Sequence, residues 1–201
     1  MSNLSRRFFV TGAAAATALA GFVPGSAWAL NDAQARSLVD SIVGDINKVI
    51  ASGKSQNAMI ADFEKIFRRY ADVNTIARST LGADARRASK SQLSAYTAAF
   101  RGYISRKYGK RFREFIGGRI EVRSVRKVKW WHEVVSTAHL KGQAPFEVLF
   151  LVSDRSGKDL FFDMKIEGIS LLVSEKTEIG SMLDRRGGDI DKLIADLKTA
   201  G

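Results

Sequence analysis

The 201-residue chain contains no cysteine, and this absence excludes several kinds of chemistry. Without a thiol the protein has no disulfide, no thiolate metal site, no iron–sulfur cluster and no cysteine nucleophile. Histidine is almost as scarce, with only His132 and His139. On one strand, residues seven positions apart point to opposite faces, so these two are not expected to share a zinc ion. The sequence therefore predicts no metal site, and stability must come from packing.

Motifs of common enzyme classes are also missing. The chain has no Gly-x-Ser-x-Gly elbow, no glycine-rich phosphate loop and no His-Glu-x-x-His segment. Asp163 and Glu167 fall on one face of an expected strand and form a formal carboxylate pair, but on an amphipathic strand we expect them to face water. No catalytic residue is predicted.

Long apolar runs are confined to the N-terminus. The pair Arg6-Arg7 precedes an apolar stretch from Phe8 to Val23, and Ala27-Trp28-Ala29 supplies the small residues of a cleavage site. This pattern is typical of a twin-arginine export signal over residues 1–29, and an ordinary secretory signal is the alternative. About 16 apolar residues are too few to anchor the chain in a bilayer. Both interpretations place the mature chain, residues 30–201, outside the cytoplasm, and its length predicts a single domain.

Positive charge is concentrated in one segment. Loss of the two signal arginines would lower the net charge from +11 to +9, and residues 101–129 alone hold eleven Lys and Arg against Glu114 and Glu121. Outside the cytoplasm the expected partners of such a segment are anionic lipid head groups or an acidic protein surface, and not nucleic acid. A solvated basic face is the alternative interpretation.

The first half of the chain has helical periodicity. Apolar residues recur every three or four positions over 32–50, 55–70 and 73–81, and Asn31 or Asp32 can cap the first of these helices. The longest helix opens at the capping box Ser89-Lys90-Ser91-Gln92, with a bend expected beyond Gly109.

From residue 119 the period changes to two. Strands are expected over 119–128, 130–140, 146–152 and 160–167, with a bulge or bend at Ser124-Val125. The third is apolar throughout, as a strand covered on both faces would be. In the fourth, alternation puts Phe162 and Met164 on one face. Helices over 171–186 and from about 190 follow. This order predicts an α+β fold with helices packed on one face of a curved, mainly antiparallel four-stranded sheet.

Bulky side chains gather on elements that are expected to face one another. These residues are the candidates for a packed core or for the lining of an apolar cavity, two possibilities that periodicity alone does not separate. They are Phe63, Phe67, Tyr70, Tyr96, Phe100, Tyr103, Ile104, Tyr108, Leu140, Phe146, Val148, Phe150, Phe162 and Met164.

Two blocks of the sequence carry a family resemblance. The first is Asp72-Val-Asn-Thr-Ile-Ala-Arg-Ser-Thr-Leu-Gly82 with the run from 91 to 108, and the second is Asp163-Met-Lys-Ile-Glu-Gly-Ile-Ser-Leu-Leu-Val173 with the run from 182 to 194. In this order they resemble the MlaC family, also called the toluene-tolerance family. The chain departs from the family pattern at 83–85, where Ala-Asp-Ala replaces the usual aromatics. It departs again at 174–176, where Ser-Glu-Lys replaces an aromatic residue and an arginine.

The resemblance implies a nuclear-transport-factor-like cone that encloses a deep apolar cavity for lipid tails, with no cofactor. It also implies a monomeric periplasmic carrier of phospholipid, an auxiliary component of an ABC transporter that supports outer-membrane lipid asymmetry. The implied partners are an inner-membrane ABC transporter complex and an outer-membrane lipoprotein complex. The candidates for head-group or partner docking are Arg106, Arg111, Arg119 and Lys127.

Three alternatives remain open at the level of sequence. The cargo could be a hopanoid or another sterol-like lipid, since one branch of the family is associated with hopanoid biosynthesis. The same fold could host an enzyme for a small apolar substrate, with His139, Asp163 or Glu167 pointing inward. The chain could instead be an interaction protein with a filled core, in which the basic segment carries the whole function.

Overall fold

The computed structural model describes residues 29–201. The expected export signal lies outside the described residues, apart from Ala29, and stays a prediction. Within residues 29–201 no helix combines the length and the apolar content needed to cross a bilayer. The elements in chain order are α1 (Asp32–Ala51), α2 (Gln56–Tyr70), α3 (Val73–Leu81), the 3-10 helix η1 (Gly82–Arg86), α4 (Lys90–Gly109), the 3-10 helix η2 (Lys110–Phe115), β1 (Arg119–Val128), β2 (Trp131–His139), β3 (Phe146–Ser153), β4 (Leu160–Ile166), β5 (Ile169–Ser170), α5 (Leu171–Arg185) and α6 (Ile190–Thr199).

The N-terminal helices begin at the caps that the sequence predicts. The Asn31 side chain accepts a hydrogen bond from the Gln34 N–H at 2.9 Å, and the Gln34 side chain accepts one from the Asn31 N–H at 3.0 Å. Ser89 and Gln92 form the same reciprocal box at the start of α4. Each box satisfies two N–H groups that have no partner inside the helix, so a local signal sets where each helix begins.

The strands form one antiparallel sheet in chain order, β1-β2-β3-β4-β5. The predicted bulge in β1 is confirmed, as a shift of register between Val122 and Ser124. The sheet has one strand more than predicted, because residues 169–170 pair with β4. In such a meander the β1–β2 and β3–β4 turns lie at one end of the sheet, and the β2–β3 and β4–β5 turns lie at the other.

The central strand β3 is covered on both faces, as its apolar sequence predicts. Val148, Phe150 and Val152 belong to the core that contains α1. Leu149 and Leu151 point to the other face, by the alternation of a strand, and they are buried as well.

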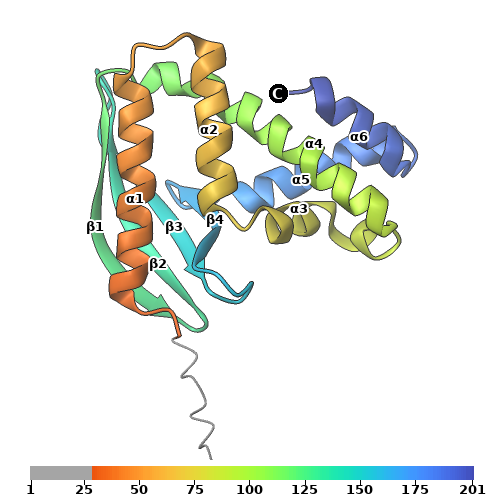
Figure 1. Ribbon diagram of the computed structural model, residues 1–201, viewed down its shortest axis with the longest axis horizontal. Helices are drawn as coiled ribbons and strands as arrows, with labels where there is room; N and C mark the ends of the chain where they lie inside the picture. Colours follow the sequence, from red (N-terminus) through yellow and green to blue (C-terminus); the bar gives the residue numbers. More distant parts are fainter. Residues whose placement is uncertain (1–28) are drawn as a thin grey trace, which may run out of the picture.

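The helices form two groups around this sheet. In Figure 1, α1 lies along β1 and β2 and α2 stands beside α1, whereas α3 to α6 form a second group on the far side of α2. Helix α2 contacts both α1 and α4, so it joins the two groups. The C-terminal helix is tied to α4 by Arg106, whose guanidinium donates hydrogen bonds to the carbonyls of Leu197 (2.6 Å) and Ala200 (2.8 Å).

Candidate functional site

The apolar interior of the protein consists of two adjoining clusters. The sheet-side cluster packs α1 and part of α2 against the sheet, and the helix-side cluster packs α3 to α6 against the rest of α2. The predicted lining residues are divided between them. The sheet-side cluster contains or contacts Phe63, Tyr70, Phe146, Val148, Phe150 and Met164. The helix-side cluster contains or contacts Phe63, Phe67, Tyr96, Phe100, Tyr103, Ile104 and Tyr108.

A row of aromatic rings crosses the boundary between the clusters. Phe63 and Phe161 are only partly buried and pack against both of them. Ring centroids are 6.2 Å apart for Phe63 and Phe67, 6.2 Å for Phe67 and Phe161, and 6.0 Å for Phe161 and Phe150. We call the junction formed by Phe63, Phe67, Phe150 and Phe161 the aromatic seam. At this junction the sheet-side cluster and the helix-side cluster contact each other, but they do not form one continuous core.

Strand β4 corrects one expectation from the sequence. Strict alternation puts Phe162 on the face of Met164, but the register shifts between Leu151 and Val152 of the neighbouring strand, so Phe161 packs into the clusters. The Phe162 ring lies instead against Trp130 and Trp131, at 5.1 and 6.4 Å. Leu140 also lies outside both clusters. Adjacent phenylalanines carry no sequence signal that tells which one faces inward.

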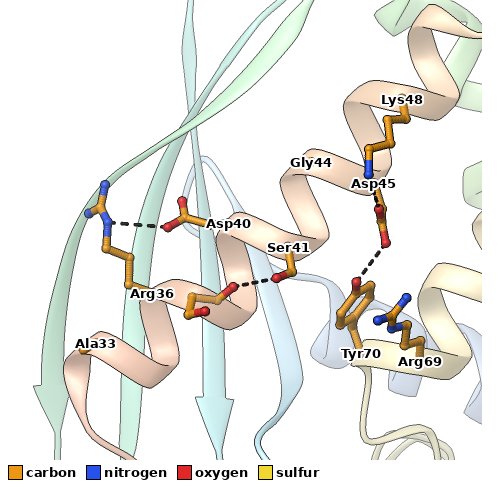
Figure 2. A pocket seen from close by; sticks show the side chains of 10 residues that line it. Ala33, Arg36, Asp40, Ser41, Gly44, Asp45, Lys48, Arg69 and Tyr70 are labelled. Atoms are coloured by element: carbon orange, nitrogen blue, oxygen red, sulfur yellow. Dashed lines mark hydrogen bonds and ion pairs between the residues drawn. The ribbon is translucent and has the colours of Figure 1, made fainter.

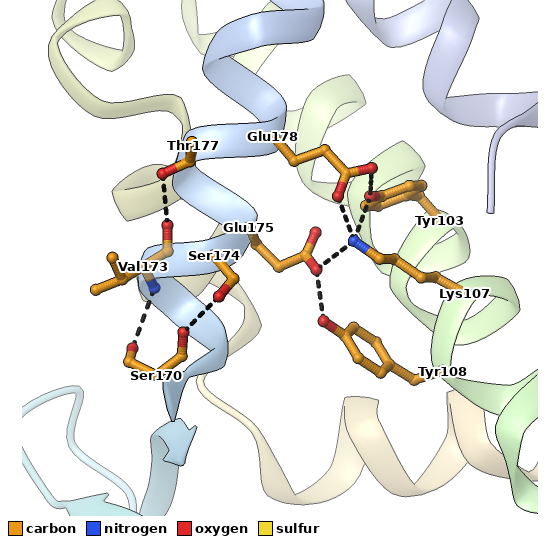
Figure 3. A network of polar contacts seen from close by, with 9 residues as sticks. All are labelled: Tyr103, Lys107, Tyr108, Ser170, Val173, Ser174, Glu175, Thr177 and Glu178. Atoms are coloured by element: carbon orange, nitrogen blue, oxygen red, sulfur yellow. Dashed lines mark hydrogen bonds and ion pairs between the residues drawn. The ribbon is translucent and has the colours of Figure 1, made fainter. Parts of the chain in front are cut away.

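A buried carboxylate lies inside the helical group, between α4 and α5. The Glu175 side chain is 3% exposed, and its Oε1 accepts from Lys107 Nζ at 2.7 Å and from the Tyr108 hydroxyl at 2.6 Å (Figure 3). Lys107 also donates to Glu178 at 2.5 Å, and the Tyr103 hydroxyl donates to the other oxygen of Glu178 at 2.8 Å. Two of the predicted lining residues, Tyr103 and Tyr108, thus use their hydroxyls to hold acidic groups of α5.

The charges of this network reinforce one another. Burial works against the charge of Lys107, but its hydrogen bonds to Glu175 and Glu178 raise the pKa of the ammonium above its ordinary value. The hydrogen bond from Lys107 lowers the pKa of Glu178. Burial, together with the nearby carboxylates, raises the pKa of Tyr103 and of Tyr108 far above the usual range. Lys107 therefore stays charged and both tyrosines stay neutral donors.

Two hollows lie at the surface of the described part of the chain. The larger, about 680 Å³, runs along the outer side of α1 (Figure 2), where Tyr70 donates to Asp45 at 2.8 Å and Lys48 donates to the same carboxylate at 3.1 Å. These bonds lower the pKa of Asp45. The smaller, about 450 Å³, lies between α3 and α4 beside Arg78 and Arg101. Of the predicted lining residues only Tyr70 borders either hollow, so the others do not surround these two spaces.

The four predicted docking cations have different surroundings. Arg106 uses its guanidinium to bind the last carbonyls of α6, which gives it a structural role in this state. Arg119 pairs with Glu121 at 2.5 Å. Arg111 and Lys127 are exposed, and no ion pair is found for either among the described side chains. Docking stays a prediction for all four, and Arg119 is exposed as well.

The groups considered for catalysis do not point into one site. Asp163 is buried, so the expectation that it faces water is wrong: its carboxylate accepts from the Ser170 hydroxyl at 2.6 Å and from the Leu172 N–H at 3.0 Å, and so holds the start of α5. Glu167 is exposed at a turn with a positive φ of 49°. His132 is buried beside Asp32, at 3.1 Å, whereas His139 lies 3.7 Å from Glu121. Within residues 29–201 no three acidic or histidine side chains come together as a metal site would need.

The fold and its interior define an α+β protein with two adjoining apolar clusters and a meander sheet. A family model described as MlaC protein matches residues 36–199, and the chain belongs to the MlaC family. This confirms the resemblance seen in the sequence. No curated protein matches the chain.

A solved structure supports the fold. The chain is similar to the phospholipid-binding protein from Ralstonia solanacearum, whose structure was determined in complex with a phospholipid at 1.53 Å. The TM-score is 0.68 and the identity 18%, over 81% of this chain and 98% of that one. At this identity the likeness shows a shared fold.

Proposed function

We propose that this protein binds a phospholipid by its acyl chains, within the aromatic seam, and carries it between membranes. Membership of the MlaC family and a structural neighbour solved with a phospholipid support a binding or transport protein and not an enzyme. The observation that carries the proposal is the seam itself, because a row of aromatic rings joins two apolar clusters that are otherwise separate. When acyl chains enter there, the aromatic rings lose contacts with one another and gain contacts with the methylene groups of the lipid.

The seam must open for lipid to enter, since the clusters are packed against each other in this structure. Opening at Phe63 and Phe161 disturbs partly buried side chains and leaves the fully buried ones, such as Phe100 and Phe150, inside their own clusters. Separation of the sheet with α1 from the group α3–α6 would widen this junction. The network of Lys107, Glu175 and Glu178 keeps α4 and α5 together as one wall while this happens.

The energetics explain why a carrier is needed. Burial contributes about 0.8 kcal/mol per methylene, so a lipid with roughly 30 of them loses on the order of 24 kcal/mol when it enters water alone. A protein interior with comparable apolar contacts makes the transfer nearly isoenergetic. The direction of transport must then come from partners, for which we propose an inner-membrane ABC transporter complex and an outer-membrane lipoprotein complex. The export signal would deliver the chain to the periplasm between them.

Lipid recovery tests this function. Native mass spectrometry of the protein purified from the periplasm is expected to show an added mass, and extraction identifies it as glycerophospholipid or as a hopanoid. Phe63→Ser at the seam is expected to lower the retained lipid several-fold, and Val173→Ser, which replaces an apolar side chain that is 62% exposed and outside both clusters, is the control. A protein free of lipid, or equal retention by the two folded variants, contradicts the proposal.

A further inference from the structure

Three aromatic rings lie together at one end of the sheet, away from both apolar clusters. Trp130 stacks on Phe162 at 5.1 Å, and Trp131 meets Trp130 edge-on at 5.0 Å. Trp130 is 41% exposed, one of few large apolar side chains that are exposed among the described residues. Indole rings are buried to a large extent on average, so an exposed tryptophan that contacts two further aromatic rings is a candidate binding surface.

The local backbone presents this ring to the outside. Lys129 adopts a left-handed conformation, with φ of 55°, which is uncommon for a residue with a side chain. The turn between β1 and β2 consists of Lys129 and Trp130, so Trp130 stands at its apex. The β3–β4 turn lies at the same end of the sheet and supplies Arg155. We call residues 127–131, 155, 158 and 162 the aromatic tip (Figure 1 shows this end of the β1–β2 hairpin).

The aromatic tip also carries positive charge. The Arg155 guanidinium lies over the Trp130 ring, 4.1 Å from its centroid. Lys127, Lys129 and Lys158 are exposed in the same two hairpins. Of the nearby acids, Glu133 is paired with Arg126 at 2.6 Å, and Asp154 accepts the Leu30 N–H at 2.9 Å. Asp32, which lies 3.1 Å from His132, and Asp159 are the other acids at this end of the sheet, and the four cations Lys127, Lys129, Arg155 and Lys158 still outnumber Asp32, Asp154 and Asp159.

We propose that the aromatic tip docks the protein onto the surface of an anionic lipid bilayer. An indole that is apolar on its face and polar at its N–H suits the head-group region, where tryptophan is enriched in membrane proteins. Lysine and arginine beside it are attracted to anionic head groups, each contributing about a fivefold gain in affinity near the surface. The tip inserts one ring and lays its cations on the head groups.

Two features favour a lipid surface over a protein partner. The exposed apolar area is small and convex at the apex of a turn, whereas protein interfaces need a broad patch of about 800 Å² on each partner. The cations lie around the ring on flexible side chains from two separate turns. Such side chains can bind head groups whose positions in the bilayer are not fixed. The docking is independent of where acyl chains bind, because the tip lies outside both clusters.

Vesicle binding tests the docking. The chain from Leu30 onward is used, since it holds every element of both clusters and lacks the apolar signal that would itself bind lipid. In that chain the only two tryptophans, Trp130 and Trp131, belong to the tip. Vesicles of phosphatidylglycerol and phosphatidylcholine are expected to bind the protein and to shift its tryptophan emission to the blue. Vesicles of phosphatidylcholine alone should bind it far more weakly, and added salt should reverse the binding.

Variants at the two ends of the sheet distinguish binding through the tip from binding that depends only on the overall charge and hydrophobicity of the protein. Trp130→Ser is expected to weaken binding on the order of tenfold. Arg155→Glu and Lys129→Glu are each expected to weaken it at least about fivefold. The matched controls lie at the opposite end: Ile169→Ser removes an apolar side chain that is 65% exposed, and Lys141→Glu reverses a charge in the β2–β3 turn. Both controls should bind as the parent chain does.

Four results would overturn the proposal: no binding to the anionic vesicles, equal binding to the neutral ones, equal loss in the control variants, or retention of binding by the tip variants. Sedimentation velocity supplies a further check. A dimer that Trp130→Ser converts to a monomer would make the tip a contact between two copies of the chain. Tip-dependent binding to an acidic polypeptide, without binding to vesicles, would assign it to a protein partner.

Discussion

The backbone N–H of Leu30 donates a hydrogen bond to the carboxylate of Asp154, 2.9 Å away and 124 positions later in the chain. Leu30 itself is 5% exposed and belongs to the sheet-side cluster. The sequence predicts that the export signal ends at Ala29. Cleavage there would turn this amide into a terminal ammonium and the hydrogen bond into an ion pair with Asp154.

This contact predicts how the processed chain is stabilised. In the chain that begins at Leu30, Asp154→Asn is expected to lower the free energy of unfolding by about 1 kcal/mol, because a charge-assisted bond at a partly buried end is lost. Urea denaturation measures the change. Asp159→Asn, in the same turn, is the control and should change stability by less than about 0.5 kcal/mol. If sequencing of the exported protein shows an N-terminus other than Leu30, the ion pair with Asp154 does not form and the prediction is contradicted.

The buried carboxylate of Glu175 predicts an asymmetric response to mutation. Lys107→Met leaves Glu175 buried without its counter-charge, and we expect a loss of roughly 2–4 kcal/mol in the free energy of unfolding. Adding Glu175→Gln removes the uncompensated charge, so the double variant should recover a large part of that loss. Denaturant titration of the parent, the two single variants and the double variant gives the coupling energy.

An exposed ion pair serves as the matched control for Lys107. Lys65 pairs with Asp62 at 3.0 Å, but the lysine is 72% exposed, so Lys65→Met should cost no more than about 0.5 kcal/mol. Similar losses for Lys65→Met and Lys107→Met would show that burial of Glu175 does not decide the effect.

The four tyrosines predict the alkaline limit of stability. Burial is the largest cause that raises the pKa of each of them, Tyr70, Tyr96, Tyr103 and Tyr108, above the ordinary value of 10.0. A group whose pKa is higher in the folded state stabilises the fold below its unfolded pKa, and this contribution is lost as the pH rises above it. The protein is therefore expected to lose stability above about pH 10.

A spectroscopic titration checks the tyrosine prediction. Tyrosinate absorbance should stay low in the folded protein at pH 10 and then rise together with the loss of far-ultraviolet circular dichroism. Tyr108→Phe, which leaves the hydroxyl-free ring in place, should weaken the alkaline loss of stability. Ionisation of several tyrosines at their ordinary pKa, without unfolding, would contradict the burial of these hydroxyls.

Local signals explain why much of the fold is predictable. The capping boxes at Asn31 and Ser89 and the bulge near Ser124 involve residues that are close in the chain, so their patterns are visible in the sequence. The same holds for β3, whose unbroken apolar run reflects burial on both faces. Each of these features leaves a pattern in a short stretch of sequence, even where, as for β3, the packing partners in α1 are distant in the chain.

Contacts between different elements of the structure explain which features the sequence did not predict or predicted wrongly. Whether Phe161 or Phe162 faces inward depends on a register shift set by the neighbouring strand. Asp163 was expected to face water, but it is buried because its carboxylate accepts from the N–H of Leu172, in the first turn of α5 nine positions later. Lys107 interrupts the apolar stripe of α4 because Glu175, 68 positions away, buries its charge beside it. The division of the interior into two clusters joined at Phe63 follows from tertiary packing, which periodicity does not encode.

The crossing of α4 and α2 predicts opposite effects of one substitution at two glycines. A Cβ at Gly109, the last residue of α4, would lie 2.9 Å from Ile60 Cγ1 and 3.1 Å from Ile60 Cα, so part of the clash is with backbone. Gly109→Ala is therefore expected to lower the free energy of unfolding by about 1–3 kcal/mol. Gly44, inside α1, has nothing within 4 Å of its added Cβ, so Gly44→Ala should raise it by up to about 1 kcal/mol through helix propensity. Thermal and urea unfolding of both variants measures the signs. Two stabilised variants would mean that α4 and α2 separate easily at this crossing, and that the helices of the two groups are less tightly joined than the packing of Ile60 on Gly109 indicates.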